Sequence, residues 1–212
     1  MLKRFLKPVC LLLPIMLSGC QTAQTLDPKA ITHIKTVHLK PVITLPQDIT
    51  YRGMADAFAS SVGGVIGGMA AESASGDRLE MQKCIQDHHI DMAAILRQEF
   101  VKTVAAKGLF VIVADNLPAD AELSLSVDDY GLGVGNTLSP DIHGLLLVTA
   151  VVTSSDGTVI WKDSSSIKPD DNANNVGYAR SDFLAAPEHF TEAFVSVADI
   201  ASARLLEDAT NP

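Results

Sequence analysis

The sequence predicts an α+β domain in which an antiparallel sheet of about five strands is covered on one face by two amphipathic helices. Two segments, residues 89–107 and 187–207, repeat apolar residues at helical spacing. Between them, residues 122–132 alternate apolar and polar residues, as a half-buried strand does, and residues 109–114 are a short apolar run. Hairpin-connected strands flanked by helices are typical of a two-layer α+β domain.

Residues 31–40 (ITHIKTVHLK) are expected to form the first strand, because they alternate and are rich in β-branched residues. Pro41 and Pro46 then interrupt regular structure. No internal repeat of 20 to 50 residues is evident. The sheet therefore begins with a short strand that precedes both predicted helices.

A glycine-rich insert follows at residues 53–76. Gly63, Gly64, Gly67 and Gly68 form two overlapping G-x-x-x-G pairs within it. Four glycines disfavour a stable helix in water, so the insert is interpreted as a loop or a closely packed surface helix. Membrane insertion or self-association is the alternative, because this spacing lets helices approach closely within a membrane.

The two predicted helices each carry one continuous apolar stripe. Lys107 followed by Gly108 is a typical end for the first helix, and Arg204 suits the dipole near the end of the second. The stripe of the first helix consists of Met92, Ile95, Leu96, Phe100 and Val104. The stripe of the second consists of Phe190, Phe194, Val197, Ala201 and Leu205.

Four further strands are expected between the helices, at residues 109–114, 122–132, 144–153 and 158–167. Ser155-Asp156-Gly157 separates the last two and predicts a hairpin, since glycine accepts a positive φ. Gly131, Gly133 and Gly135 lack the spacing of a dinucleotide fingerprint. They are interpreted as the end of a strand and a flexible loop.

The first 19 residues have the form of a secretory signal. A basic start precedes the apolar residues 8–17, and this run is about half the length that a membrane-spanning helix needs. The tetrapeptide Leu17-Ser18-Gly19-Cys20 resembles the bacterial lipobox. The alternatives are a plain secretory signal, or an uncleaved anchor with a chance cysteine.

The lipobox resemblance implies that Cys20 is diacylated by fatty acids such as palmitate, becomes the N-terminus and is acylated at its amine. Residues 20–30 would then be the lipidated end and a tether of at most roughly 35 Å. In similar lipoproteins a residue such as Gln21 allows sorting to the outer membrane. We therefore expect a domain of residues 31–212 that is held at the outer membrane and faces the periplasm.

Composition limits the classes of partner. Removal of residues 1–19 takes away three of the 16 basic residues and none of the 25 acidic ones, so the formal charge changes from −9 to −12. Such a charge argues against nucleic acid and against electrostatic adhesion to anionic lipid. Cys84 is the single cysteine left in the mature domain besides Cys20, and burial is its expected state, with a reactive thiol or an intermolecular bridge as the alternatives.

No catalytic, cofactor or metal motif is recognisable, and no such residue is assigned. Cys84, His88 and His89, with Asp87 or Asp91, come nearest to a metal set, but a capped helix start with solvated histidines is preferred. Residues 170–181 begin like a calcium loop with Asp170, Asn172 and Asn174. They lack the glycine and the final glutamate, so a polar turn is preferred.

Residues 85–168 resemble small envelope-assembly lipoproteins of the curli-secretion and TolB N-terminal type. The resemblance rests on ILRQEFVKTVAAKGLFVIV, ADAELSLSVDDYGL and SSDGTVIWKDSS, and the glycine-rich insert departs from it. It implies a non-enzymatic role through an envelope protein partner. Homo-oligomerisation, carriage of a lipid or other apolar ligand, and a hydrolase remain as alternatives; for a hydrolase no serine lies in an elbow motif.

Overall fold

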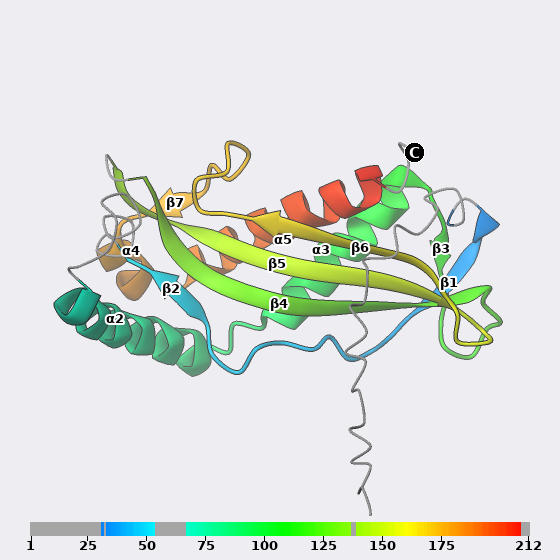
Figure 1. The fold of residues 1–212 in the computed structure, drawn as a ribbon, viewed down its shortest axis with the longest axis horizontal. Helices are drawn as coiled ribbons and strands as arrows, with labels where there is room; N and C mark the ends of the chain where they lie inside the picture. The colour runs from blue at the N-terminus through cyan, green and yellow to red at the C-terminus, as the bar shows by residue number, and fades with distance from the viewer. Residues whose placement is uncertain (1–30, 32, 54–66, 137–138, 209–212) are drawn as a thin grey trace, which may run out of the picture.

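The computed structural model describes residues 31, 33–53, 67–136 and 139–208. The signal segment, Cys20 and the tether therefore lie outside the described residues, as do Gly63 and Gly64. The described chain folds into an α+β structure with one curled sheet and helices packed against it (Figure 1). The α+β class that the sequence predicted is confirmed.

Within the described ranges the sheet has seven strands rather than about five. β3, β1, β4, β5 and β6 follow one another across the sheet, while β2 pairs with β4 and β7 pairs with β5. The strands are β1 (Thr36–Leu39), β2 (Thr50–Arg52), β3 (Val111–Ile112), β4 (Ala121–Asn136), β5 (Ser139–Ser154), β6 (Val159–Ile167) and β7 (Gly177–Tyr178).

The sheet is mixed, so the prediction of an antiparallel sheet was wrong in part. β4, β5 and β6 form the expected antiparallel meander, but β1 and β2 pair with β4 in parallel, and β3 pairs with β1 in parallel. Parallel pairing needs a crossover connection. The described helices between β2 and β3 form the crossover that joins β1 to β3. The same helices followed by β3 form the crossover that joins β1 and β2 to β4.

The hairpin between β5 and β6 is the one that the sequence predicted. Gly157 has a φ of 87°, and the Ser154 N–H donates to the Thr158 carbonyl at 2.9 Å. The Asp156 carboxylate accepts the Thr158 N–H at 2.9 Å. A hydrogen bond from the Ser154 hydroxyl is the main cause that lowers the pKa of Asp156 to about 2. The turn is thus fixed by local groups.

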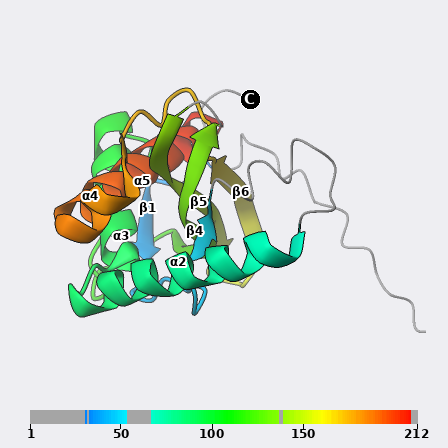
Figure 2. The ribbon, with the colours of Figure 1, turned by 90° about the vertical axis from the view of Figure 1, so that its left-hand side faces the viewer.

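Helices cover one face of the sheet (Figure 2). α3 (Met92–Lys107) and α5 (Glu188–Asp208) pack against each other, and α5 also contacts β5 and β6. Both helices lie within a few residues of their predicted ranges. Asp91 caps the start of α3, and Gly108 ends it with a φ of 64°. Packing on one face is also as predicted.

The predicted stripes form the centre of the core. Nine of their ten residues are buried, and Ile95 is half-buried against them. Their partners on the sheet include Leu123 of β4 and Leu146 of β5, which are fully buried. Each such side chain contributes about 1.5–3 kcal/mol relative to an exposed one. Burial of these stripes therefore fixes the helix layer on the sheet.

Two further helices occur in the described chain. α2 (Gly67–Asp87) begins inside the glycine-rich insert, and α4 (Arg180–Ala185) precedes α5. α2 contacts β2 and α4 at one end of the sheet, where Met81 and Ile85 are buried. The surface-helix interpretation of the insert therefore holds for its C-terminal part, and residues 54–66 lie outside the described residues.

The glycines of β4 correct a second prediction. Gly131, Gly133 and Gly135 lie inside β4 and neither end it nor form a loop. A Cβ atom at Gly131, whose φ is 154°, would lie 1.8 Å from the carbonyl oxygen of Thr50 in β2. Glycine gives the same local signal in a turn and at a close approach of two backbones. Here it allows β2 to pair with β4.

We expect Gly131→Ala to lower the free energy of unfolding by more than about 2 kcal/mol, because the new methyl group would displace β2 and strain the backbone. Gly76→Ala in α2 is the control, since a Cβ there meets no atom within 4 Å; it should be neutral or stabilising by about 0.5–1 kcal/mol. Urea unfolding followed by circular dichroism measures both. Equal stability of Gly131→Ala and the unsubstituted protein would contradict the close approach.

Candidate functional site

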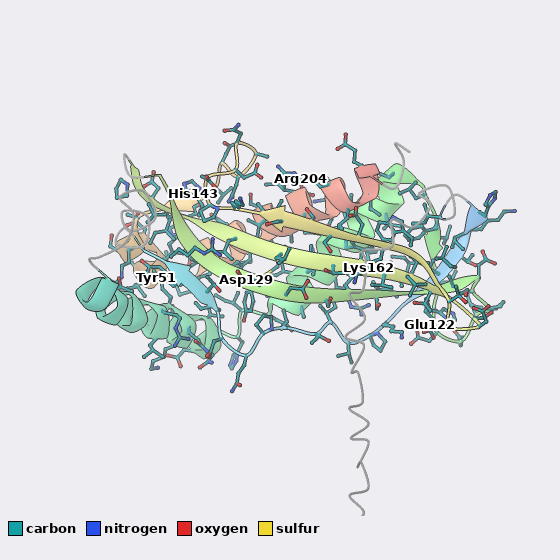
Figure 3. All side chains as sticks on the ribbon, in the orientation of Figure 1. Tyr51, Glu122, Asp129, His143, Lys162 and Arg204 are labelled. Carbon is teal, nitrogen blue, oxygen red and sulfur yellow. The ribbon has the colours of Figure 1, made fainter. Side chains whose placement is uncertain are left out.

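The face of the sheet turned away from the helices is polar. Its side chains alternate with the buried ones along residues 121–127 of β4 and 146–152 of β5, and Glu122 and Lys162 are among the exposed ones (Figure 3). Thr149 Oγ1 donates to Asp128 Oδ2 at 2.7 Å and lies 2.8 Å from Ser164 Oγ. A sheet with one covered face commonly presents such a polar surface to water. This face offers hydroxyl groups, and Glu122 and Thr153 line a polar pocket of about 460 Å³ at its β1 end.

The β6 edge is a second surface. Across the described part of the chain, β6 stands at the end of the strand order and pairs with β5 only. It has nine residues, whereas β3 at the opposite edge has two. A long edge strand is a template on which another chain can add a strand. The sheet therefore has one edge suited to strand addition.

A groove lies beside β3, at the end of the sheet opposite α2. Its volume is about 580 Å³, and ten residues from three segments line it. The C-terminal part of α3, the connection from α3 to β3, and Ile34 with Lys35 before β1 form its walls. Nine of its ten lining residues are apolar or glycine. The groove therefore suits an apolar ligand.

The sequence did not reveal this groove, because its walls come from segments that are far apart in the chain. Val111 and Val101 are 62% and 38% exposed at its rim, whereas Phe110 and Val104 are buried at its floor. Apolar residues in 109–114 gave only a strand signal. A strand of six residues was expected there, but only Val111 and Ile112 pair with β1, and both line the groove together with Leu109 and Phe110.

The lipidation residue Cys20 lies outside the described residues and stays a prediction. The structure instead shows where the tether joins the domain. Ile31 is 2% exposed, and its carbonyl accepts the Ile34 N–H at 3.0 Å. The described chain therefore enters the domain at Ile31, one turn before Ile34, which lines the groove.

The sequence suggested that Cys84, His88 and His89 lie at the start of a helix, but the structure places them at the end of α2. Cys84 lies in the last turn of α2, and its carbonyl accepts the His88 N–H at 3.1 Å. His89 follows the helix with a φ of 53°, and both histidines are exposed. Within the described residues no three His, Cys, Asp or Glu side chains gather as a metal site would need.

Cys84 is half-buried rather than fully buried. Burial, followed by the neighbouring Asp87 carboxylate, raises the pKa of the thiol. A raised pKa keeps a thiol protonated and therefore weakly nucleophilic at neutral pH. The position of Cys84 thus favours packing against the core over reactivity.

The segment that resembles a calcium loop is a polar turn held to the core. Asn174 is buried, and its amide donates to the carbonyls of Gly144 at 2.8 Å and Lys168 at 3.1 Å. Arg204 of α5 makes two hydrogen bonds to Asp171, at 2.6 and 2.7 Å. Arg204 therefore serves this pairing, which the sequence did not predict.

Charged groups also hold α2 in place. Arg180 of α4 lies 3.0 Å from Asp77 Oδ1 and also pairs with Glu80, both on α2. Gln82 donates to Asp48 Oδ1 at 2.9 Å, just before β2. These partly exposed pairs are individually weak. Together with the buried Met81 they fix the position of α2 at this end of the sheet.

No helix within the described ranges combines the length and the hydrophobicity that crossing a bilayer requires.

Comparisons with known proteins find no matching family model and no matching curated protein. Solved structures that resemble this chain include protein XCC0632 from Xanthomonas campestris, of family DUF330, at 14% identity and a TM-score of 0.38. That match covers 53% of this chain and 57% of the Xanthomonas protein, so the chain spans little more than half of its length.

Two further solved structures are similar at the same low level. A dodecameric single-substitution variant of PelC from Paraburkholderia phytofirmans has 13% identity and a TM-score of 0.38, over 82% of this chain and 85% of PelC. Lipoprotein GNA1162 from Neisseria meningitidis has 14% identity and a TM-score of 0.27, over 74% of this chain and 98% of that protein.

Asp171→Asn tests the tie between the turn and α5. The Arg204 side chain, then the Ala173 N–H, lowers the pKa of Asp171. Because the folded pKa is depressed, the stabilisation is present above the ordinary value of about 4 and is lost as pH falls through the folded value. We expect a loss of about 1 kcal/mol at pH 7 that shrinks as the pH falls below the ordinary value of about 4.

The measurement is urea unfolding at a series of pH values. Asp170→Asn is the matched control, because Asp170 is exposed on the same turn. It should leave stability unchanged at every pH. A loss that is constant with pH for Asp171→Asn would rule out the ion pair as its cause.

Proposed function

We propose that this protein is an outer-membrane lipoprotein, anchored through Cys20, whose periplasmic domain acts without catalysis as an accessory or assembly factor of an envelope complex. The lipobox-like Leu17-Ser18-Gly19-Cys20 supports the anchor. The fold supports the second part, because its accessible features are surfaces for contact: a polar sheet face, a long edge strand and an apolar groove. The partner in this proposal is another envelope protein.

The observation that carries the proposal is the β6 edge. Nine residues of extended backbone stand at the end of the sheet. Soluble proteins usually protect such an edge with an irregular strand or a covering element. The opposite edge is protected in this way, because its strands β3 and β2 have only two and three residues. The contrast favours β6 as the place where a partner strand adds.

Site-specific photo-crosslinking in cells tests this proposal. A photoreactive amino acid at Ser166, exposed on β6, should capture one envelope protein reproducibly. The same amino acid at Ser126, on the polar face of the more central strand β4, is the matched control and should capture at least five times less. Mass spectrometry identifies the captured protein.

Three outcomes decide between the alternatives. A distinct envelope protein at position 166 supports the proposal. Crosslinks between copies of this chain would instead indicate a homo-oligomer built on β6. Equal capture at both positions, or none at either, would contradict a docking role for the edge.

Carriage of a lipid or other apolar ligand is the second candidate, and the groove beside β3 favours it. A volume of about 580 Å³ falls within the roughly 300–1,000 Å³ of pockets that hold small molecules. Native mass spectrometry of the domain produced without residues 1–20 should then show a bound lipid. Val111→Glu at the rim should remove that lipid, and a domain that carries none would count against this candidate.

A further inference from the structure

The groove between α3 and β3 lies beside the point where the tether leaves the domain. Ile31, the first described residue, is linked by a hydrogen bond of 3.0 Å to Ile34, which lines the groove. Thirty residues precede Ile31. Ten of them separate Cys20 from Ile31 and can span at most roughly 35 Å, so a group on Cys20 can reach any part of the groove.

The chemistry of the groove selects hydrocarbon. Phe110 and Val104 form an apolar floor, and Val101 and Val111 form an apolar rim. Lys35 is the one charged residue that lines it, and Lys35 is exposed. The apolar side chains that line the groove match a hydrocarbon chain, which needs no hydrogen-bond partner.

The groove is open because small residues face it from α3 and because β3 is short. Ala105 and Gly108 present little or no side chain on the α3 side, and β3 ends after two residues, so no further strand closes the edge. Replacement of an exposed rim residue should therefore change the groove without disturbing the core. This property makes the rim suitable for mutagenesis.

We propose that this groove holds one fatty acyl chain of the lipid attached to the protein's own Cys20. This inference rests on the proposed lipid anchor. The other acyl chains insert in the bilayer, and the chain in the groove holds the α3–β3 end of the domain against the membrane. The domain would then have a fixed orientation and would not swing on its tether.

A short tether makes this binding effective even at low affinity. It keeps the acyl chain at an effective concentration of about 1 mM near the groove. The attached chain therefore has an advantage over a free lipid at micromolar concentration.

The test uses the full chain in its native membrane. Cells are fed a diazirine-bearing fatty acid, the membranes are irradiated, and peptides linked to the Cys20 lipid are identified by mass spectrometry. We expect crosslinks to residues 101–112 of the same molecule. Val111→Glu should reduce them at least fivefold, whereas Val42→Glu, at a residue that is 75% exposed and lies outside the groove lining, should leave them unchanged.

The outcomes separate this inference from the lipid anchor on which it rests. An acylated Cys20 whose crosslinks reach only lipids or other segments would overturn the inference and leave the anchor intact. A Cys20 without acyl groups would overturn both. Crosslinks to the groove that persist in Cys20→Ser would show a free lipid as the occupant. Thermal unfolding of both valine variants establishes that they are folded.

Discussion

The contact on which the rest of the fold depends is the close packing of α5 against β5 at Gly144. A Cβ atom at this position would lie 2.9 Å from Val197 Cγ1 and 3.0 Å from the Ala193 carbonyl oxygen, so glycine allows the helix to approach the sheet. The Gly144 carbonyl also accepts the Asn174 amide at 2.8 Å. One position therefore fixes the helix layer and the turn before β7. The two amphipathic helices pack on one face of the sheet, so the other face of the sheet and the β6 edge stay accessible.

Local signals were sufficient for the elements that local interactions stabilise. The stripes of α3 and α5, the cap at Asp91 and the Asp156-Gly157 hairpin all depend on residues a few positions apart. The parallel pairing of β1 and β2 with β4 could not be predicted in this way, because the paired residues are about 80 positions apart. Gly131 shows the limit most clearly, since its purpose becomes visible only when β2 is in place.

The candidate sites differ in the same way, because some rest on a linear motif and others on segments that are far apart in the chain. The lipobox-like tetrapeptide is a linear motif and is recognisable without a structure. The groove is not, because Ile34 and Val101 come together only after α3 packs and β3 pairs with β1. We propose that the tether orients the domain at a membrane through the groove, and that the β6 edge is then presented to a partner.

The central claim is that this edge is occupied in the cell. The most direct measurement is amide hydrogen exchange of the full protein, compared between native outer membranes and the purified state. The account predicts that amides of residues 159–167 exchange more slowly in native membranes, while those in the centre of β4 are unchanged, because strand addition engages the backbone of β6. Equal exchange of β6 in the two states would contradict a partner at this edge.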